Sequence, residues 1–113
     1  PSNPLRLTNH CNTGEKVSIY GAPAGTYPII LDTYISNFNL PADEVGFEDI
    51  GENVEILMIS AILFPGHSGS PIVNDHGEVC GIVFASMRSY GGLAIKSKEI
   101  KKFIGPHLFL APL

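Results

Sequence analysis

Glycine and proline interrupt this chain so often that few of the segments between them could form a long helix. The 113 residues include 12 Gly and 9 Pro, spread along the whole length. Turns form at such residues, and β-branched or aromatic runs between turns are typical of short strands. Hydrophobic residues make up 44% and charged residues 16%, which argues against disorder. One small folded domain with a modest core is therefore expected.

Short apolar segments predict most of the strands. The residues from Lys16 to Tyr20 alternate around Val17 and Ile19, which is a strand pattern. For the most apolar segment, 54–63, periodicity alone leaves a helix open, but its β-branched residues favour a strand. Six segments are expected to form strands: 16–20, 28–38, 54–63, 71–73, 78–84 and 91–95.

Two connections complete the expected fold. The turn sequence from Asn74 to Gly77 joins two of these strands into a β-hairpin. Ser97 is a candidate N-cap for a short helix over residues 98–104. About six short strands and one terminal helix predict an all-β protein with a six-stranded antiparallel β-barrel.

Charge limits the partners that this chain can have. The net charge is −4, and the acidic segment from Leu40 to Asn53 is expected to be a long exposed loop. The basic residues form one short run, which we interpret as the solvated face of the terminal helix. We therefore expect no nucleic-acid partner. That run consists of Lys96, Lys98, Lys101 and Lys102. No apolar stretch reaches membrane-spanning length, so no membrane span is expected.

Two cysteines, Cys11 and Cys80, leave two alternatives open at this stage. They could form a disulfide or remain as two free thiols. Neither belongs to a Cys-x-x-Cys motif or a Cys/His cluster, so a zinc site is not expected. We also expect no other metal and no cofactor.

The segment from Gly66 to Pro71 places Ser68 in a glycine-rich turn. Such a turn can expose a hydroxyl while backbone N–H groups point into the same space. Acyl transfer needs this combination of a nucleophile and donors aimed at the developing oxyanion. An isolated Gly-x-Ser-Gly sequence would be weak evidence, since many serines lie in ordinary turns.

The flanking residues strengthen the interpretation, because the segment 66–82 resembles the nucleophile region of chymotrypsin-fold serine proteases. Their pattern is Gly-x-Ser-Gly-(Gly or Ser)-Pro, followed by a hairpin that ends in Gly-Ile or Gly-Val. The segment 14–23 is similar to the Gly-x-x-Val-x-x-x-Gly-x-Pro strand of the HtrA-like (Deg) branch. Ile35-Ser36 and the segment 92–104 resemble later elements of that protease domain. This resemblance implies that residues 1–113 form the C-terminal β-barrel of a trypsin-like serine protease.

The resemblance also implies roles for individual residues. Ser68 would be the nucleophile, and the backbone N–H groups of Gly66, His67 and Ser68 would form the oxyanion hole. His67 replaces the usual Asp or Asn, so activation by a buried new N-terminal amine is not expected. Ser70 replaces the commoner Gly but also occurs in relatives.

Two segments would line the primary substrate pocket by the same resemblance. Neither contains an acid, so a preference for Arg or Lys is not expected, and a small or medium apolar side chain is. The alternative is that these residues are simply core. They are Ala61, Ile62, Leu63, Val83, Phe84, Ala85 and Ser86.

None of the four histidines lies in a sequence context typical of the catalytic base. His67 is adjacent to the nucleophile, and His10, His76 and His107 are expected to be solvated or locally bonded. In the family, the His and Asp come from an N-terminal barrel. The chain starts at Pro1 rather than Met, and we expect that barrel either upstream in the same protein or in a separate chain.

The predicted function is therefore a serine endopeptidase with polypeptide substrates, in which this chain supplies the nucleophile but not the base. Alone it is expected to be inactive and to associate with its N-terminal barrel or with another copy of itself. The alternative is a degenerate, non-catalytic binding or assembly module with the same fold.

Overall fold

The computed structural model describes residues 6–21, 29–47, 50, 54–61, 63, 67–87 and 91–104. The side chains of residues 29, 87 and 101–104 lie outside this description. Within these ranges, the strands are β1 (Arg6–Leu7), β2 (Lys16–Gly21), β3 (Ile29–Pro41), β4 (Glu55–Ile59), β5 (Pro71–Asn74), β6 (Glu78–Met87) and β7 (Gly91–Lys96). A short 3-10 helix, η2, covers Ala42–Val45, and one α-helix, α1, covers Ser97–Ile104.

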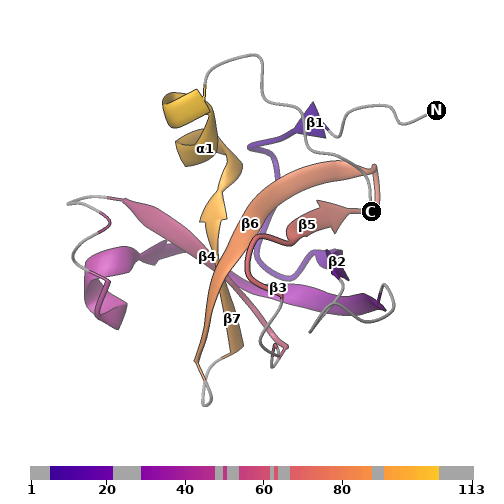
Figure 1. Ribbon diagram of the computed structural model, residues 1–113, viewed down its shortest axis with the longest axis horizontal. Coiled ribbons are helices and arrows are strands. Elements are labelled where there is room, and N and C mark those ends of the chain that lie inside the picture. Colours follow the sequence, from indigo (N-terminus) through magenta and orange to yellow (C-terminus); the bar gives the residue numbers. More distant parts are fainter. Residues whose placement is uncertain are drawn as a thin grey trace.

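Six of the strands close into an antiparallel barrel. The order is β6-β5-β2-β3-β4-β7, and β7 pairs with β6 to complete the ring. β1 lies outside the ring, parallel to β6, with Arg6 opposite Glu78 and Leu7 opposite Val79. In Figure 1, β6 and β7 form a long hairpin whose open end leads to α1. The predicted barrel, the β5–β6 hairpin and the terminal helix are thus confirmed, and the helix begins one residue earlier than expected, at Ser97.

Alternation along the strands builds the barrel interior. In β2, Val17, Ile19 and Gly21 are buried, while the residues between them are partly exposed. The main core cluster draws on most of the barrel strands and on two loops. Its buried members are Cys11, Val17, Ile19, Ile35, Phe38, Leu57, Ile59, Leu63, Ile72, Cys80, Val83 and Ala94.

A disulfide joins Cys11 to Cys80, which decides between the two alternatives left open by the sequence. Cys11 lies between β1 and β2, and Cys80 lies in β6. Both are buried, with 3% and 0% of their surfaces exposed. The bond therefore ties the segment that enters the barrel to a central strand from within the core.

The prediction of a long exposed loop over residues 40–53 is wrong for its first half. Leu40 and Pro41 extend β3, and η2 follows directly, with Ala42 fully buried. The ring of Phe47 meets Phe84 of β6 edge to face, with centroids 5.2 Å apart. These residues form part of a second hydrophobic cluster around Ile56 and Leu93. The acidic segment thus begins by packing on the barrel.

The prediction of a solvated lysine face is also wrong for Lys96. This residue ends β7 and is 2% exposed. Its Nζ donates to Oδ1 of Asn39 at 3.2 Å and to Oε1 of Glu55 at 3.3 Å, and it lies 4.0 Å from the ring centroid of Phe38. A buried ammonium needs such partners to offset its lost hydration. Lys98 in α1 is partly exposed, and the side chains of Lys101 and Lys102 lie outside the described part of the chain.

Ser97 links α1 to the barrel. It is fully buried, and its hydroxyl donates to the backbone carbonyl of Val79 in β6. The N–H of Thr8 donates to the same carbonyl at 2.9 Å. One carbonyl of β6 thereby anchors both the helix and the segment that follows β1.

The disulfide should contribute strongly to stability. It closes a loop with a sequence separation of 69, and loop-closure entropy for this length corresponds to about 4 kcal/mol. Reduction should therefore lower the denaturant midpoint markedly, as measured by guanidinium unfolding with and without dithiothreitol. The double variant Cys11→Ala/Cys80→Ala is the control, because its midpoint should not respond to the reductant. Equal midpoints for oxidised and reduced wild-type protein would contradict this prediction.

The buried ammonium of Lys96 should make stability depend on pH. Burial lowers the pKa of Lys96 below its usual 10.5, although the hydrogen bond and the charge of Glu55 act in the opposite direction. Because the pKa in the folded chain lies below 10.5, the unfolded chain keeps this proton at pH values where the folded chain has lost it. Between the two pKa values, the free energy of unfolding therefore rises with pH. Relative to Lys96→Met, which cannot titrate, wild-type stability should increase toward pH 10.5 in denaturation curves. A difference that stays constant with pH would refute this account.

Candidate functional site

Residues 67–70, called here the serine turn, are held against β6 by backbone hydrogen bonds. The N–H of Gly69 donates to the carbonyl of Val83 at 2.8 Å, and the N–H of Val83 donates to the carbonyl of Ser70 at 3.0 Å. Within the turn, the N–H of Ser70 donates to the carbonyl of His67 at 2.9 Å. These bonds fix the backbone of Gly69 and Ser70 to the sheet.

The sequence Gly-Ser within the turn has a backbone reason. Gly69 has φ of +89°, a conformation that side-chain-bearing residues rarely adopt, and a Cβ there would meet nothing within 4 Å. Glycine is therefore required at this position for its conformation and not for lack of space. The reversal that it makes leaves Ser68 exposed at the tip of the turn.

The two neighbours of this tip point inward. His67 is 2% exposed and Ser70 is 7% exposed. A solvated His67 is thus excluded, while His10 and His76 are exposed, as expected for solvated histidines. His67 is thus buried while the adjacent Ser68 is exposed, so their two side chains face in different directions. His107 lies outside the described residues.

Of the predicted oxyanion-hole residues, the structure describes His67 and Ser68, and Gly66 lies outside the described residues. Both described residues belong to the serine turn, where the N–H groups of Gly69 and Ser70 are already committed to carbonyls. The role of the N–H groups of His67 and Ser68 stays a prediction.

The two predicted pocket segments lie side by side. The N–H of Leu63 donates to Oγ of Ser86 at 3.3 Å, which joins the end of one segment to the end of the other. Leu63 and Val83 are buried in the main core cluster, and Ala61 packs against that cluster. Phe84 and Ala85 are partly buried beside the second cluster. Ile62 lies outside the described residues.

The aspartates that the structure describes lie on β3, on η2 and in the β5–β6 turn. Asp32 of β3 accepts a hydrogen bond from Oγ of Ser18 in β2 at 2.6 Å, which is a cross-strand contact on the barrel surface. Asp43 lies in η2 and Asp75 in the β5–β6 turn, and both are exposed. Asp49 lies outside the described residues.

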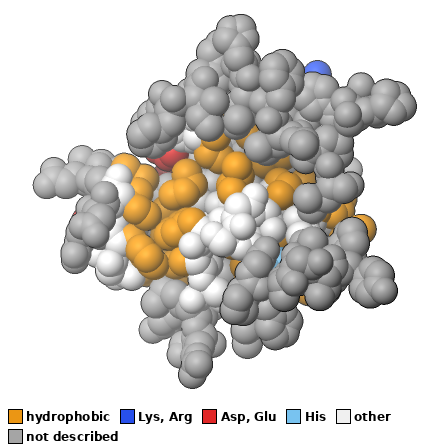
Figure 2. Space-filling model, viewed as in Figure 1, with side chains coloured by type: hydrophobic (Ala, Val, Ile, Leu, Met, Phe, Trp, Pro, Cys, Tyr) orange, Lys and Arg blue, Asp and Glu red, His pale blue; other side chains and the backbone are white. Residues whose placement is uncertain are grey.

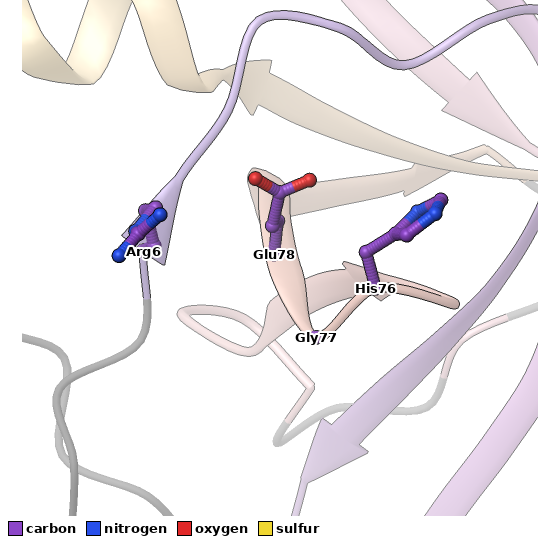
Figure 3. A pocket seen from close by; sticks show the side chains of 4 residues that line it. All are labelled: Arg6, His76, Gly77 and Glu78. Carbon is purple, nitrogen blue, oxygen red and sulfur yellow. The ribbon is translucent and has the colours of Figure 1, made fainter.

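A surface pocket of about 350 Å³ lies between β1 and the β5–β6 hairpin. Its lining consists of Arg6, His76, Gly77 and Glu78. In the close view of Figure 3, the carboxylate of Glu78 stands between the side chains of Arg6 and His76. None of the residues predicted for the serine site lines this pocket, and sequence reasoning gave no signal for it.

The residues that the structure describes contain neither a metal-binding cluster nor a membrane-spanning helix. Among them, no group of three or more His, Cys, Asp or Glu side chains could hold a metal ion. In the same ranges, no helix has the length and apolar character needed to cross a membrane.

Comparison with known proteins identifies the family. The family model described as the trypsin-like peptidase domain matches residues 1–82. The mitochondrial serine protease HTRA2 of Bos taurus is 31% identical over 104 residues, which is 92% of this chain and 22% of that protein. The putative serine protease HhoA of Synechocystis is 32% identical over 82 residues, covering 73% of this chain and 20% of that protein. This chain therefore spans about a fifth of the length of these curated relatives.

Solved structures support the fold. The active form of the Rv3671c protease of M. tuberculosis superimposes with a TM-score of 0.77 at 21% identity, over 100% of this chain and 52% of that one. The serine endoprotease of Yersinia pestis superimposes with a TM-score of 0.67 at 22% identity, over 87% and 33% of the two chains. The closed barrel, with Ser68 on a turn bonded to β6, agrees with these matches. The chain therefore belongs to the trypsin-like peptidase family and resembles its HtrA-like members.

Proposed function

We propose that this chain is the C-terminal β-barrel of an HtrA-like serine endopeptidase and that Ser68 is its nucleophile. The observation that carries the proposal is the exposure of Ser68 on a turn whose flanking backbone groups are bonded to β6. A nucleophile held by a rigid sheet needs little reorganisation when it attacks, and such preorganisation lowers the barrier to acyl transfer.

The proposed reaction proceeds through a covalent acyl-enzyme on Ser68. Oγ of Ser68 attacks the scissile carbonyl carbon of a polypeptide, and its proton passes to a histidine of the N-terminal barrel. The N–H groups of Gly66, His67 and Ser68 stabilise the oxyanion that develops on the carbonyl oxygen. The leaving amine takes the proton from the histidine, and water then hydrolyses the acyl-enzyme.

Substrate preference would come from the paired pocket segments. The hydrogen bond between Leu63 and Ser86 supports a shared wall, and apart from Ser86 the residues of both segments are apolar. Neither segment offers an acid to pair with a cationic side chain. We therefore propose that the residue before the scissile bond is small or medium-sized and apolar.

The base and its orienting Asp would come from a partner barrel, in the same protein or in a separate chain. Figure 2 shows hydrophobic side chains gathered over the middle of one face of the barrel. An apolar area of this kind favours association. The proposed partner is the N-terminal protease barrel, and a further copy of the chain is a second candidate.

A serine-directed phosphonate tests this proposal on the complete protein that contains this chain. The wild-type protein should be labelled at Ser68, because only an activated hydroxyl displaces the phosphonate leaving group at a useful rate. Ser68→Ala should abolish labelling and lower kcat for peptide hydrolysis by roughly four orders of magnitude or more. Mass spectrometry of the labelled peptide and a fluorogenic peptide assay give the two readouts.

The control is Ser60→Ala, which removes another exposed serine hydroxyl at the end of β4. It should leave labelling and hydrolysis unchanged. If the folded wild-type protein is not labelled, and Ser68→Ala preserves its biological role, the protein is instead a non-catalytic binding module.

A further inference from the structure

The buried side of the serine turn rests on the end of β2. Gly21 is the last residue of β2 and is buried. A Cβ placed on Gly21 would lie 2.8 Å from Oγ of Ser70 and 3.0 Å from Cδ2 of His67. These distances are too short for a non-bonded carbon atom, so a side chain at position 21 would displace one or both neighbours.

The requirement for glycine here is spatial. Gly21 does not have the positive φ that makes Gly69 necessary, since it is absent from the residues with that conformation among those described. Its role is to let two side chains of another segment approach the backbone of β2 closely. Those two side chains, His67 and Ser70, bracket the exposed Ser68 in the sequence.

The serine turn is thus held on two sides by different means. On one side, hydrogen bonds of Gly69 and Ser70 to Val83 fix its backbone to β6. On the other side, the imidazole of His67, only 2% exposed, packs against Gly21 of β2. A shift of this ring moves the residue directly bonded to Ser68, whereas the bonds to β6 act on the residues that follow Ser68.

We propose that Gly21 and His67 form a positioning pair that sets the orientation of Ser68, so that the end of β2 controls the reactivity of the nucleophile. This proposal rests on the proposed function of Ser68. The imidazole packs where a side chain on residue 21 would otherwise lie. The position of the ring fixes the peptide bond between His67 and Ser68, and with it the N–H and the side chain of Ser68. In this scheme neither Gly21 nor the imidazole of His67 contacts the substrate, and the backbone N–H of His67 keeps its proposed role in the oxyanion hole.

Gly21→Ala tests the pair in the complete protein. The added methyl group must push the ring away by a few tenths of an ångström. A misplacement of about 1 Å at a reacting group can cost on the order of 100-fold in rate, so for this smaller shift we expect the rate constant for phosphonate labelling at saturation, and kcat for a peptide substrate, to fall about three- to ten-fold. KM should change little, because the hydrogen bond between Leu63 and Ser86 that joins the predicted pocket segments involves neither Gly21 nor His67.

A second variant separates the two contacts. Gly21→Ala/Ser70→Gly removes the hydroxyl that lies 2.8 Å from the added carbon but keeps the ring at 3.0 Å. If the ring transmits the effect, this double variant stays slow. If it labels at the wild-type rate, the clash with Ser70 was responsible and the proposal is overturned.

Val79→Ala is the matched control for lost stability. Val79 is fully buried in β6 near the disulfide and is not among the residues predicted for the site. Its truncation should lower the denaturation midpoint at least as much as Gly21→Ala does, yet the folded protein should label at the wild-type rate. Equal slowing in Val79→Ala would overturn the proposal, because loss of stability alone would then explain the effect.

These outcomes separate failure of the proposed function from failure of the positioning pair. An unlabelled wild-type protein overturns both the proposed function and the positioning pair. A labelled wild-type protein with an equally reactive Gly21→Ala variant overturns only the pair. Slow labelling in both Gly21 variants, with normal labelling in Val79→Ala, supports it.

Discussion

The architecture depends on the double pairing of β6, because this strand closes the sheet into a ring. β6 bonds to β5 along its first half and to β7 along its second half, so neither edge of the barrel is left open to pair with another chain. The same strand holds the rest of the molecule in place. Val79 accepts hydrogen bonds from Thr8 and Ser97, Cys80 forms the disulfide, and Val83 fixes the serine turn. The attachments follow one another along a few consecutive residues, and each joins β6 to a part of the chain distant in sequence.

The candidate site takes its rigidity from this strand and from β2. The turn around Ser68 is bonded to β6 through Gly69 and Ser70, and the side chain of His67 packs on Gly21. These two contacts allow a short loop on a small domain to present an exposed serine hydroxyl in a fixed position.

Lys96 shows how neighbouring residues in the sequence can have opposite environments. Lys96 and Lys98 are two positions apart, yet the first ends a strand and is buried among Asn39, Glu55 and Phe38, while the second lies on a partly exposed helix. Interpreting the four lysines as one helix face was wrong because Lys96 belongs to the strand that precedes the helix. The contacts that decide the matter come from β3 and β4, more than 40 residues away in the sequence, so no local pattern could have indicated them.

Local patterns by themselves determined much of this protein. Alternation in β2, the turn from Asn74 to Gly77 and the glycines around Ser68 were sufficient to predict strands, a hairpin and an exposed serine, because strand period and turn conformation depend on nearby residues. Only the tertiary structure decided the pairing of Cys11 with Cys80, the packing of Phe47 on Phe84, and the contact of His67 with Gly21. Each of these joins segments separated by more than 30 residues, and such contacts exist only once the ring of strands has closed. The sequence therefore specified a serine on a turn, and the closed barrel decided what that turn rests on.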